Sequence, residues 1–365
     1  MRKWLALALM VLMALSACAW ADEAPSATGT VTEVEKYGHA RLDITIEDFE
    51  AAGFTLGDIV TVTAGTYMGD MPYLNGYYVD AGEYMVRAYP GHETIAICIN
   101  YGRFADVAGI DAGDPVTLKL KEKAGALTLQ EINNLVYTTD RADYTSDEVF
   151  ANFRQVTVGE IGVGKFFRSA SPVDNQYGRA AYAGPLVEAA GVRCVMNLAN
   201  TPEWLEELFA DESFDNAYYQ GLYDNGLVIA LGMSVNYASD EFAEGIVTGL
   251  TFLAQHDGPY LVHCTEGKDR AGFTCILLEA LMGASEDEII ADYMLSYRNY
   301  YGIVPGTDQY ELIAEREARA MLRTIASQEK GASLEGVDLQ AAAVAYLTTH
   351  GMVWEDIEAL QSNLR

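Results

Sequence analysis

The pattern of apolar and polar positions changes part-way along the chain. Between about residues 28 and 136, short runs rich in β-branched residues are separated by turns rich in Gly, Asp and Asn. This pattern is typical of β-strands joined by tight connections. The predicted strands are 30–34, 41–46, 59–62, 83–88, 94–99 and 115–120. We therefore expect a smaller, mainly-β, barrel-like domain over residues 26–137.

From residue 151 onward, apolar runs of strand length alternate with stretches of helical periodicity. Residues 192–198 and 227–231 are predicted strands, and both precede helical stretches. This order predicts an α/β domain over residues 151–365, with a mostly parallel sheet flanked by helices and its site at the carboxyl ends of the strands. The polar segment 138–150 is predicted to be a linker.

Residues 259–273 carry the clearest chemistry of the second half. An apolar run ends at His263 and Cys264, a five-residue loop leads to Arg270, and a helical stretch follows directly. The N-terminus of that helix directs free backbone N–H groups into the loop, where they can hold a tetrahedral oxyanion. These groups and the fixed charge of Arg270 favour a thiolate at Cys264. Arg270 can also donate two hydrogen bonds to phosphoryl oxygens.

The pattern His-Cys-x5-Arg resembles the signature loop of cysteine-dependent phosphatases. Its fuller form, His-Cys-x-x-Gly-Lys-Asp-Arg, resembles the atypical bacterial branch of protein-tyrosine and dual-specificity phosphatases, some of which also use phosphoinositides. Asn-Phe-Arg at 152–154 and Phe-Arg-Ser at 167–169 are similar to elements that precede the loop in that branch, so the resemblance spans about residues 152–365. It implies a cysteine-phosphatase-like fold and hydrolysis through a phosphocysteine.

The resemblance also implies roles for single residues. Cys264 is expected to attack phosphorus while Arg270 and the loop amides hold the equatorial oxygens. A general acid must protonate the leaving oxygen. Asp269 is the first candidate; Asp224, 40 residues before Cys264, is either a second candidate on a mobile loop or a turn former. The residues expected at the substrate-binding site are His263, Thr265, Glu266, Gly267, Lys268, Ala271, Gly272 and Arg168.

The loop departs from the phosphatase pattern at Ala271. The family usually has Ser or Thr there, and its hydroxyl helps the thiolate leave when phosphocysteine breaks down. Ala271 predicts slow turnover, or a substitute donor such as Thr265. It also motivates a rival interpretation, in which the domain is a slow or inactive phosphate binder within a surface binding protein.

The charge of the chain limits its partners. Acidic residues outnumber basic ones by 53 to 23, giving a net charge of −30, which argues against nucleic-acid binding and against passive adhesion to anionic lipid. A phosphate ester must therefore be attracted by a local positive pocket. A phosphorylated protein carrying phosphotyrosine is the first expected substrate, and a phosphoinositide or inositol phosphate the second.

No cofactor is expected. The five histidines are scattered without metal-ligand spacing, so no metal is predicted. Residues 159–166 nearly match the nucleotide-binding loop motif, but Phe166 stands where that motif has the hydroxyl residue that holds magnesium.

Residues 1–21 resemble an export signal: Arg2 and Lys3 precede a short apolar run. Two processing sites compete. Leu-Ser-Ala-Cys at 15–18 predicts a lipid anchor at Cys18, whereas Ala-Trp-Ala at 19–21 predicts ordinary cleavage. Either predicts an exported bacterial protein, secreted or lipid-anchored on the outer face of a membrane.

The first half shows a second, weaker resemblance. Residues 29–40 and 95–102 are similar to the C-terminal β domain of S-adenosylmethionine hydrolases. The catalytic N-terminal domain of that family is missing, so the resemblance implies a fold and no activity. Five tyrosines among glycines either line a surface for an unknown ligand or cover a β face: Tyr67, Tyr73, Tyr77, Tyr78 and Tyr84.

Overall fold

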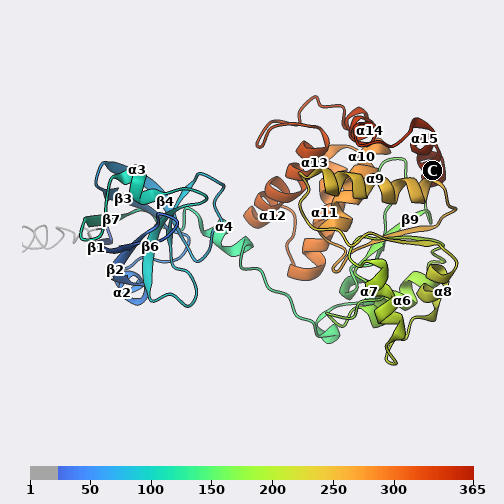
Figure 1. Cartoon of the computed structure of the whole chain (residues 1–365), viewed down its shortest axis with the longest axis horizontal. Coiled ribbons are helices and arrows are strands. Elements are labelled where there is room, and N and C mark those ends of the chain that lie inside the picture. The colour runs from blue at the N-terminus through green and yellow to red at the C-terminus, as the bar shows by residue number, and fades with distance from the viewer. Residues whose placement is uncertain (1–23) are drawn as a thin grey trace, which may run out of the picture. The chain divides into compact units, whose positions relative to one another are not determined.

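The structure is a computed structural model that describes residues 24–365. Two compact units make up the chain, one ending at Asn134 and the other running from Leu135 to Arg365 (Figure 1). The predicted export signal and the predicted lipidation site at Cys18 lie outside the described residues.

The first unit is a closed barrel, with strand order β1-β2-β6-β5-β4-β3-β7 and β7 pairing back onto β1. Neighbouring strands are antiparallel except for the parallel pair β4–β5. The strands are β1 (Ser26–Val34), β2 (Ala40–Thr45), β3 (Ile59–Ala64), β4 (Tyr67–Leu74), β5 (Tyr84–Arg87), β6 (Thr94–Ile99) and β7 (Pro115–Glu122); the helices are α2 (Ile46–Ala51), α3 (Phe104–Ala108) and α4 (Leu127–Ile132). The predicted barrel-like β region is confirmed.

Strand β4 was not predicted, because Gly69, Asp70 and Pro72 interrupt its apolar pattern. Residues 67–72 of the strand pair with β3 and the last two with β5, and Met71 and Tyr73 on it are buried. Tyr73 packs edge-on against the ring of Phe49, with centroids 4.9 Å apart. Cross-strand pairing and core burial thus outweigh the local turn preference.

The second unit is built on a five-stranded sheet of order β11-β10-β12-β9-β8. The first four strands in this order are mutually parallel, and the edge strand β8 runs antiparallel to β9. The strands are β8 (Arg154–Gln155), β9 (Phe166–Ser169), β10 (Cys194–Asn197), β11 (Val228–Ala230) and β12 (Tyr260–His263). The predicted mixed α/β class is confirmed.

Helices cover both faces of this sheet. Figure 1 shows α6 (Ala180–Ala189), α7 (Pro202–Ala210) and α8 (Ala217–Asp224) on one side. The helices on the other side are α9 (Asp240–Ala254), α10 (Arg270–Leu281), α11 (Glu286–Tyr301), α12 (Asp308–Ile313), η2 (Ala314–Ala318), α13 (Arg319–Ile325), α14 (Leu339–Thr349) and α15 (Trp354–Leu364). The central strand β12 leads into α10, which is buried throughout from Ala271 to Leu281.

The segment 138–150, expected as a linker, belongs to the second unit. It contains η1 (Arg141–Asp143) and α5 (Asp147–Phe150). Tyr144 and Phe150 pack with Tyr300 of α11, and Arg179 Nε donates to the Phe150 carbonyl at 2.8 Å. The acidic residues of the segment suggested a solvated connection, but its two buried aromatic side chains anchor it to the helices.

The described residues show neither a membrane span nor a metal cluster. Within 24–365, no helix has the length and hydropathy to cross a bilayer, and no three His, Cys, Asp or Glu side chains are grouped to hold a metal ion. Cys98, Cys194, Cys264 and Cys275 are all buried and free. The thiol of Cys264 is therefore available for chemistry.

Candidate active site

Strand β12 delivers Cys264 to the carboxyl edge of the sheet. The strand lies between β10 and β9, and its last residue, His263, is in register with Asn197 and Ser169. Because the three strands are parallel, all of them leave the sheet at the edge where the loop 264–269 begins. Cys264 itself is 2% exposed. The nucleophile candidate thus lies at the base of a loop enclosed by the sheet and the start of α10.

The carbonyl groups of the loop are bound by the surrounding structure. Thr265 O accepts from the Ser171 N–H at 3.1 Å, Glu266 O from the Tyr300 hydroxyl at 2.5 Å, and Gly267 O from Arg168 at 2.9 Å. By contrast, no hydrogen bond among the described residues has a backbone N–H of residues 265–269 as its donor. With their carbonyls held by outside donors, these residues keep their amides free for an oxyanion.

Gly267 makes this path of the backbone possible. Its φ of +66° lies in the left-handed region, and a Cβ there would come within 2.2 Å of the Ser169 carbonyl oxygen. That contact is with backbone of the neighbouring strand, which cannot move aside. The loop therefore needs glycine at this position to pass close to β9.

Arg270 is held over the loop by groups from three segments. One terminal nitrogen donates to Met233 O at 2.8 Å and Leu198 O at 3.3 Å, and the other to Thr265 Oγ1 at 3.0 Å. Its Nε is buried and has no partner among the described residues. The guanidinium is fixed in place and retains a donor for a ligand. Ala271 follows it, fully buried and without a hydroxyl.

Asp269 and Lys268 form the outer side of the loop. Burial raises the pKa of Asp269 above its usual range, although the Lys268 ammonium 3.7 Å away opposes the shift. Lys268 Nζ lies 5.1 Å from the ring centre of Tyr297 and 5.4 Å from that of Tyr301. Burial disfavours its charge, yet Tyr297 and Asp269 outweigh this effect and the pKa of Lys268 is raised. The arrangement places a carboxyl that favours its protonated form beside loop amides that have no partner among the described residues.

Residues 152–365 match the model described as the Tyrosine phosphatase family. The chain belongs to this family. The phosphatase resemblance of the second half is thereby confirmed at the level of the family.

Three individual proteins are also similar to parts of the chain. A candidate tyrosine-protein phosphatase of Cupriavidus necator is 46% identical over 48 residues, which are 13% of this chain and 18% of that protein. An uncharacterized conserved protein from Thermotoga maritima is 22% identical over 27% of this chain and 37% of its own, with a TM-score of 0.25. The core catalytic domain of the PP-IP phosphatase SIW14 from S. cerevisiae is 21% identical over 48% of this chain and 91% of its own, with a TM-score of 0.28. The structural scores are too low to add to the family assignment, and the resemblance of the barrel to S-adenosylmethionine hydrolases stays a prediction.

Within this tyrosine phosphatase domain, two residues expected at the substrate lie behind the loop. Arg168 is fully buried and donates to Asp292 at 2.8 Å and to the carbonyls of Gly267 and Lys268. Because β9 lies directly beside β12, the arginine supports the loop from beneath instead of binding substrate. The prediction for Arg168 was wrong in this respect.

His263 is the second of these residues. It is fully buried, and its Nε2 is hydrogen-bonded at 2.9 Å to the Tyr219 hydroxyl, which also accepts from Asn197 at 3.2 Å. Burial lowers the pKa of His263 to about 3, so the imidazole is neutral at ordinary pH. Its local hydrogen bond fixes the end of β12, next to Cys264.

The structure does not bring Asp224 to the loop. This residue is exposed at the end of α8, just before β11 begins. Since β11 and β12 are parallel through β10, the start of β11 and the end of β12 lie at opposite edges of the sheet. The prediction of Asp224 as an alternative acid is therefore wrong, and its alternative as a turn former at the end of α8 fits this placement. Asp269, within the loop itself, remains the candidate acid.

Two residues at the loop were not predicted from the sequence. Asn152 is fully buried with a φ of +47°, and its amide donates to the carbonyls of Glu266 and Gly267, each at 3.2 Å. The hydroxyl of Tyr137 donates to the Glu266 carboxylate, and its ring stacks on that of Tyr300 at 5.1 Å. Asn152 lay in a recognised element without an assigned role, whereas Tyr137 lies before the matched residues and carried no sequence signal.

Proposed function

We propose that this chain is a cysteine-dependent phosphatase that hydrolyses phosphomonoesters through a phosphocysteine intermediate, with phosphotyrosine as its first substrate. The observation that supports this most strongly is the loop around Cys264, whose carbonyls are bound from outside while its amides and the Arg270 Nε have no partner. A phosphoryl group bound there would accept from all of these donors at once.

The first chemical step uses Cys264 and Asp269. The thiolate attacks phosphorus, the sulfur–phosphorus bond forms, and the bond to the ester oxygen breaks. Asp269, whose raised pKa favours the protonated form, gives its proton to the leaving oxygen. Arg270 and the amides balance the charge on the equatorial oxygens.

The second step releases phosphate. Water attacks the phosphocysteine, Asp269 accepts its proton, and the thiolate of Cys264 departs. Thr265 can assist, because its hydroxyl oxygen accepts from Arg270 at 3.0 Å and its own proton is left to be donated. It would then supply the hydrogen bond that Ala271 cannot.

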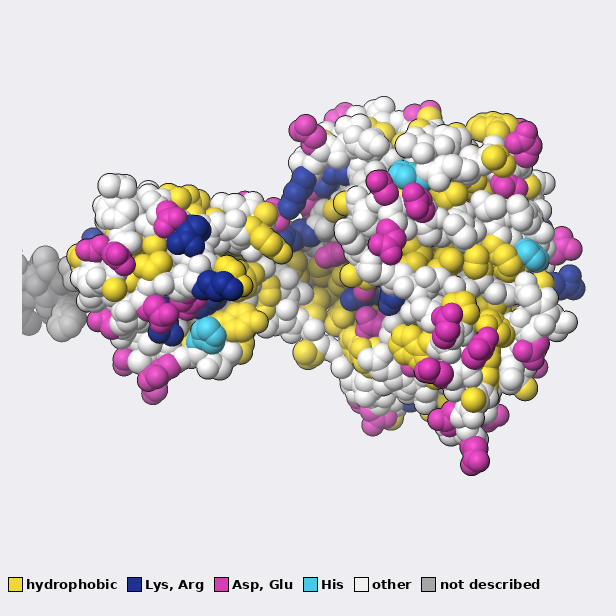
Figure 2. All heavy atoms as spheres, in the orientation of Figure 1, with side chains coloured by type: hydrophobic (Ala, Val, Ile, Leu, Met, Phe, Trp, Pro, Cys, Tyr) yellow, Lys and Arg dark blue, Asp and Glu magenta, His cyan; other side chains and the backbone are white. Residues whose placement is uncertain are grey.

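The charge of the loop favours a substrate with a single phosphate. Its two cations, Lys268 and Arg270, are accompanied by two carboxyl groups, Glu266 and Asp269. The net charge of the whole chain is −30, and Figure 2 shows acidic side chains scattered over the visible face. A polyphosphorylated inositol would bring more negative charge than this loop can neutralise. A phosphoinositide or inositol phosphate is therefore the second candidate.

Aromatic side chains beside the loop support an aromatic ester. Tyr137 and Tyr301 are partly exposed, and with Tyr300 they form a group of ring contacts next to Glu266. Rings at this position can stack on the phenyl group of phosphotyrosine, which an aliphatic phosphoserine lacks.

The test is phosphate release under reducing conditions without added metal. A phosphotyrosine peptide, a phosphoserine peptide, phosphoinositides and inositol phosphates are compared for the native chain, Cys264→Ser and the matched control Cys98→Ala, which removes a buried thiol from the barrel. We expect the phosphotyrosine peptide to be turned over fastest, with activity lost only in Cys264→Ser. Binding of phosphoesters without turnover in any variant would instead support the phosphate-binding alternative that Ala271 motivates.

The proposal includes export of the protein. The charged start and short apolar run of residues 1–21 support it. Cell fractionation tests export, and the mass of the mature N-terminus distinguishes lipid attachment at Cys18 from ordinary cleavage. Full-length protein retained in the cytoplasm would contradict this part of the proposal.

A further inference from the structure

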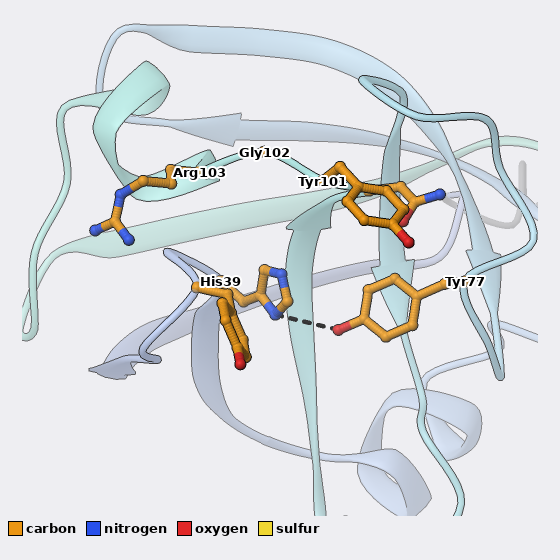
Figure 3. A pocket seen from close by; sticks show the side chains of 7 residues that line it. His39, Tyr77, Tyr101, Gly102 and Arg103 are labelled. Carbon is orange, nitrogen blue, oxygen red and sulfur yellow. Dashed lines mark hydrogen bonds between the residues drawn. The ribbon is translucent and has the colours of Figure 1, made fainter.

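The barrel carries a pocket that the phosphatase chemistry does not use. It encloses about 810 Å³, which lies within the roughly 300–1,000 Å³ typical of small-molecule sites. Figure 3 shows its side chains, which come from three separate stretches of the chain. This barrel pocket is lined by the tyrosines Tyr37, Tyr77 and Tyr101 together with His39, Asn100 and Arg103.

The charged groups around the barrel pocket are already paired. Arg103 donates to Asp106 at 2.6 Å. Arg87, buried beneath the pocket, donates to Glu35 at 3.1 Å and to the Tyr77 hydroxyl at 2.6 Å. Arg87 is buried and Arg103 is exposed, but each already has a carboxylate partner, which leaves little net charge for a ligand to neutralise. The pocket is therefore suited to a neutral ligand.

His39 provides an unused polar atom. The residue is 6% exposed, and its Nδ1 lies 3.3 Å from the Glu35 carboxylate and 3.2 Å from the Tyr77 hydroxyl. For its Nε2, residues 24–365 provide no hydrogen-bond partner, and Figure 3 shows this nitrogen facing the side on which Tyr101 and Gly102 lie. Burial and the nearby Arg87 lower the pKa of His39, which keeps the ring neutral. This nitrogen is not one of the fully buried unpaired atoms of the described residues, so it can bond to water or to a ligand that enters the pocket.

The aromatic rings of the pocket are tilted against one another, and neither of the two ring pairs that His39 forms is parallel. The His39 ring lies 6.4 Å from that of Tyr37 at an angle of 45°, and 5.7 Å from that of Tyr77 at 42°. A flat ligand sandwiched between rings needs parallel faces about 7 Å apart, twice the van der Waals separation of roughly 3.5 Å. Tilted faces instead fit a puckered ring with C–H groups on its face and hydroxyl groups at its edge. Lys36 lies over the Tyr37 ring at 5.2 Å and does not line the pocket.

Tyr101 is held at the edge of the pocket in a strained and exposed conformation. Its φ is +55° and the residue is 93% exposed. A non-glycine residue in this region is uncommon, and residues held in such conformations cluster at ligand-binding positions. The fold gains no burial from this ring, so a ligand is the natural partner for it.

We propose that the barrel pocket binds a neutral saccharide, with the rings of Tyr37 and Tyr101 against its C–H faces and His39 and Asn100 bonded to its hydroxyl groups. Asn100 is positioned for this because its amide nitrogen already donates to Val79 O at 2.8 Å, which leaves its side-chain oxygen as an acceptor. The proposal is independent of the phosphatase reaction and assigns a ligand class to the barrel.

The test is calorimetric titration of the full chain with maltose, cellobiose, lactose and N,N′-diacetylchitobiose, with adenosine and phosphotyrosine as comparison ligands. The variants are Tyr101→Gly, which also relieves the backbone strain, and Tyr37→Ala. Met68→Ala is the matched control, because it removes an exposed apolar side chain of β4 that does not line the pocket. Phosphate release and circular dichroism spectra check that each variant is folded.

We expect at least one of the four saccharides to bind with a millimolar or tighter Kd. Tyr101→Gly and Tyr37→Ala should each weaken that binding by about tenfold, the worth of one lost aromatic contact, and Met68→Ala should leave it unchanged. The absence of saccharide binding to the native chain would overturn the proposal. Saccharide binding that both tyrosine variants leave intact would also overturn it. Adenosine binding that displaces the saccharide and is lost in these variants would overturn it as well.

Discussion

The role of Arg168 as a support for the loop is open to a direct test. Substitution by methionine keeps most of the side-chain volume but removes the charge and all donors. The variant loses the ion pair to Asp292 at 2.8 Å and the hydrogen bonds to Gly267 O at 2.9 Å and Lys268 O at 3.3 Å. Both stability and activity should respond.

The expected magnitude follows from what remains after the change. Breaking a buried ion pair from one side costs roughly 3–5 kcal/mol. Asp292 keeps Arg154 at 3.0 Å, and Gly267 O keeps Asn152 at 3.2 Å. The lower end therefore applies, and we expect the free energy of unfolding of the second unit to fall by about 3 kcal/mol. Displacement of the loop should lower kcat/KM by about 100-fold.

Denaturant unfolding followed by far-UV circular dichroism and phosphatase assays on Arg168→Met measure the two effects. The matched control is Arg319→Met, which breaks the partly exposed pair of Arg319 with Glu286 at 2.7 Å and should cost at most about 1 kcal/mol. If Arg168→Met costs no more than this control and keeps its kcat/KM, the loop does not depend on Arg168 and our reasoning is refuted.

Three further predictions concern the reaction. Because the pKa of Asp269 is raised and its protonated form is the acid, kcat should fall as pH rises through that pKa. The Asp269→Asn variant should lower kcat by a factor on the order of 10² to 10⁴ and remove this pH dependence. If the variant kept the pH profile of the native chain, Asp269 would not be the acid. In stopped-flow assays with an aryl phosphate, Ala271→Ser should raise the steady-state rate that follows the burst, and Thr265→Val should lower it. Each change should be roughly fivefold, the effect of one hydrogen bond. Equal steady-state rates would rule out assistance by a hydroxyl group. Tyr137→Phe keeps the ring contacts but removes the hydroxyl that donates to Glu266. It should lower kcat/KM by about fivefold and the free energy of unfolding by only about 1 kcal/mol. Activity equal to that of the native chain would show that this contact has no effect on the loop.

The sequence by itself determined the local part of the site. Residues 264–270 are contiguous, and a strand, a loop and a helix that follow one another fix where the thiol, the amides and the arginine lie. The strand–helix alternation predicted the α/β class for the same reason, since periodicity is a local property. Strand β4 escaped prediction because Gly69, Asp70 and Pro72 favour turns locally, while its pairing partners lie elsewhere in the chain.

The tertiary structure alone decided what surrounds the loop. Arg168 and Asp224 both looked like site residues, but only the parallel register of the sheet shows that one lies beneath the loop and the other at the opposite edge. Tyr137 reaches Glu266 across 129 positions of sequence, a contact that no local pattern encodes. The barrel pocket likewise gathers residues from separate strands and loops. Contacts between residues far apart in the sequence bring these side chains together. Their roles are therefore decided by the fold and not by their neighbours in sequence.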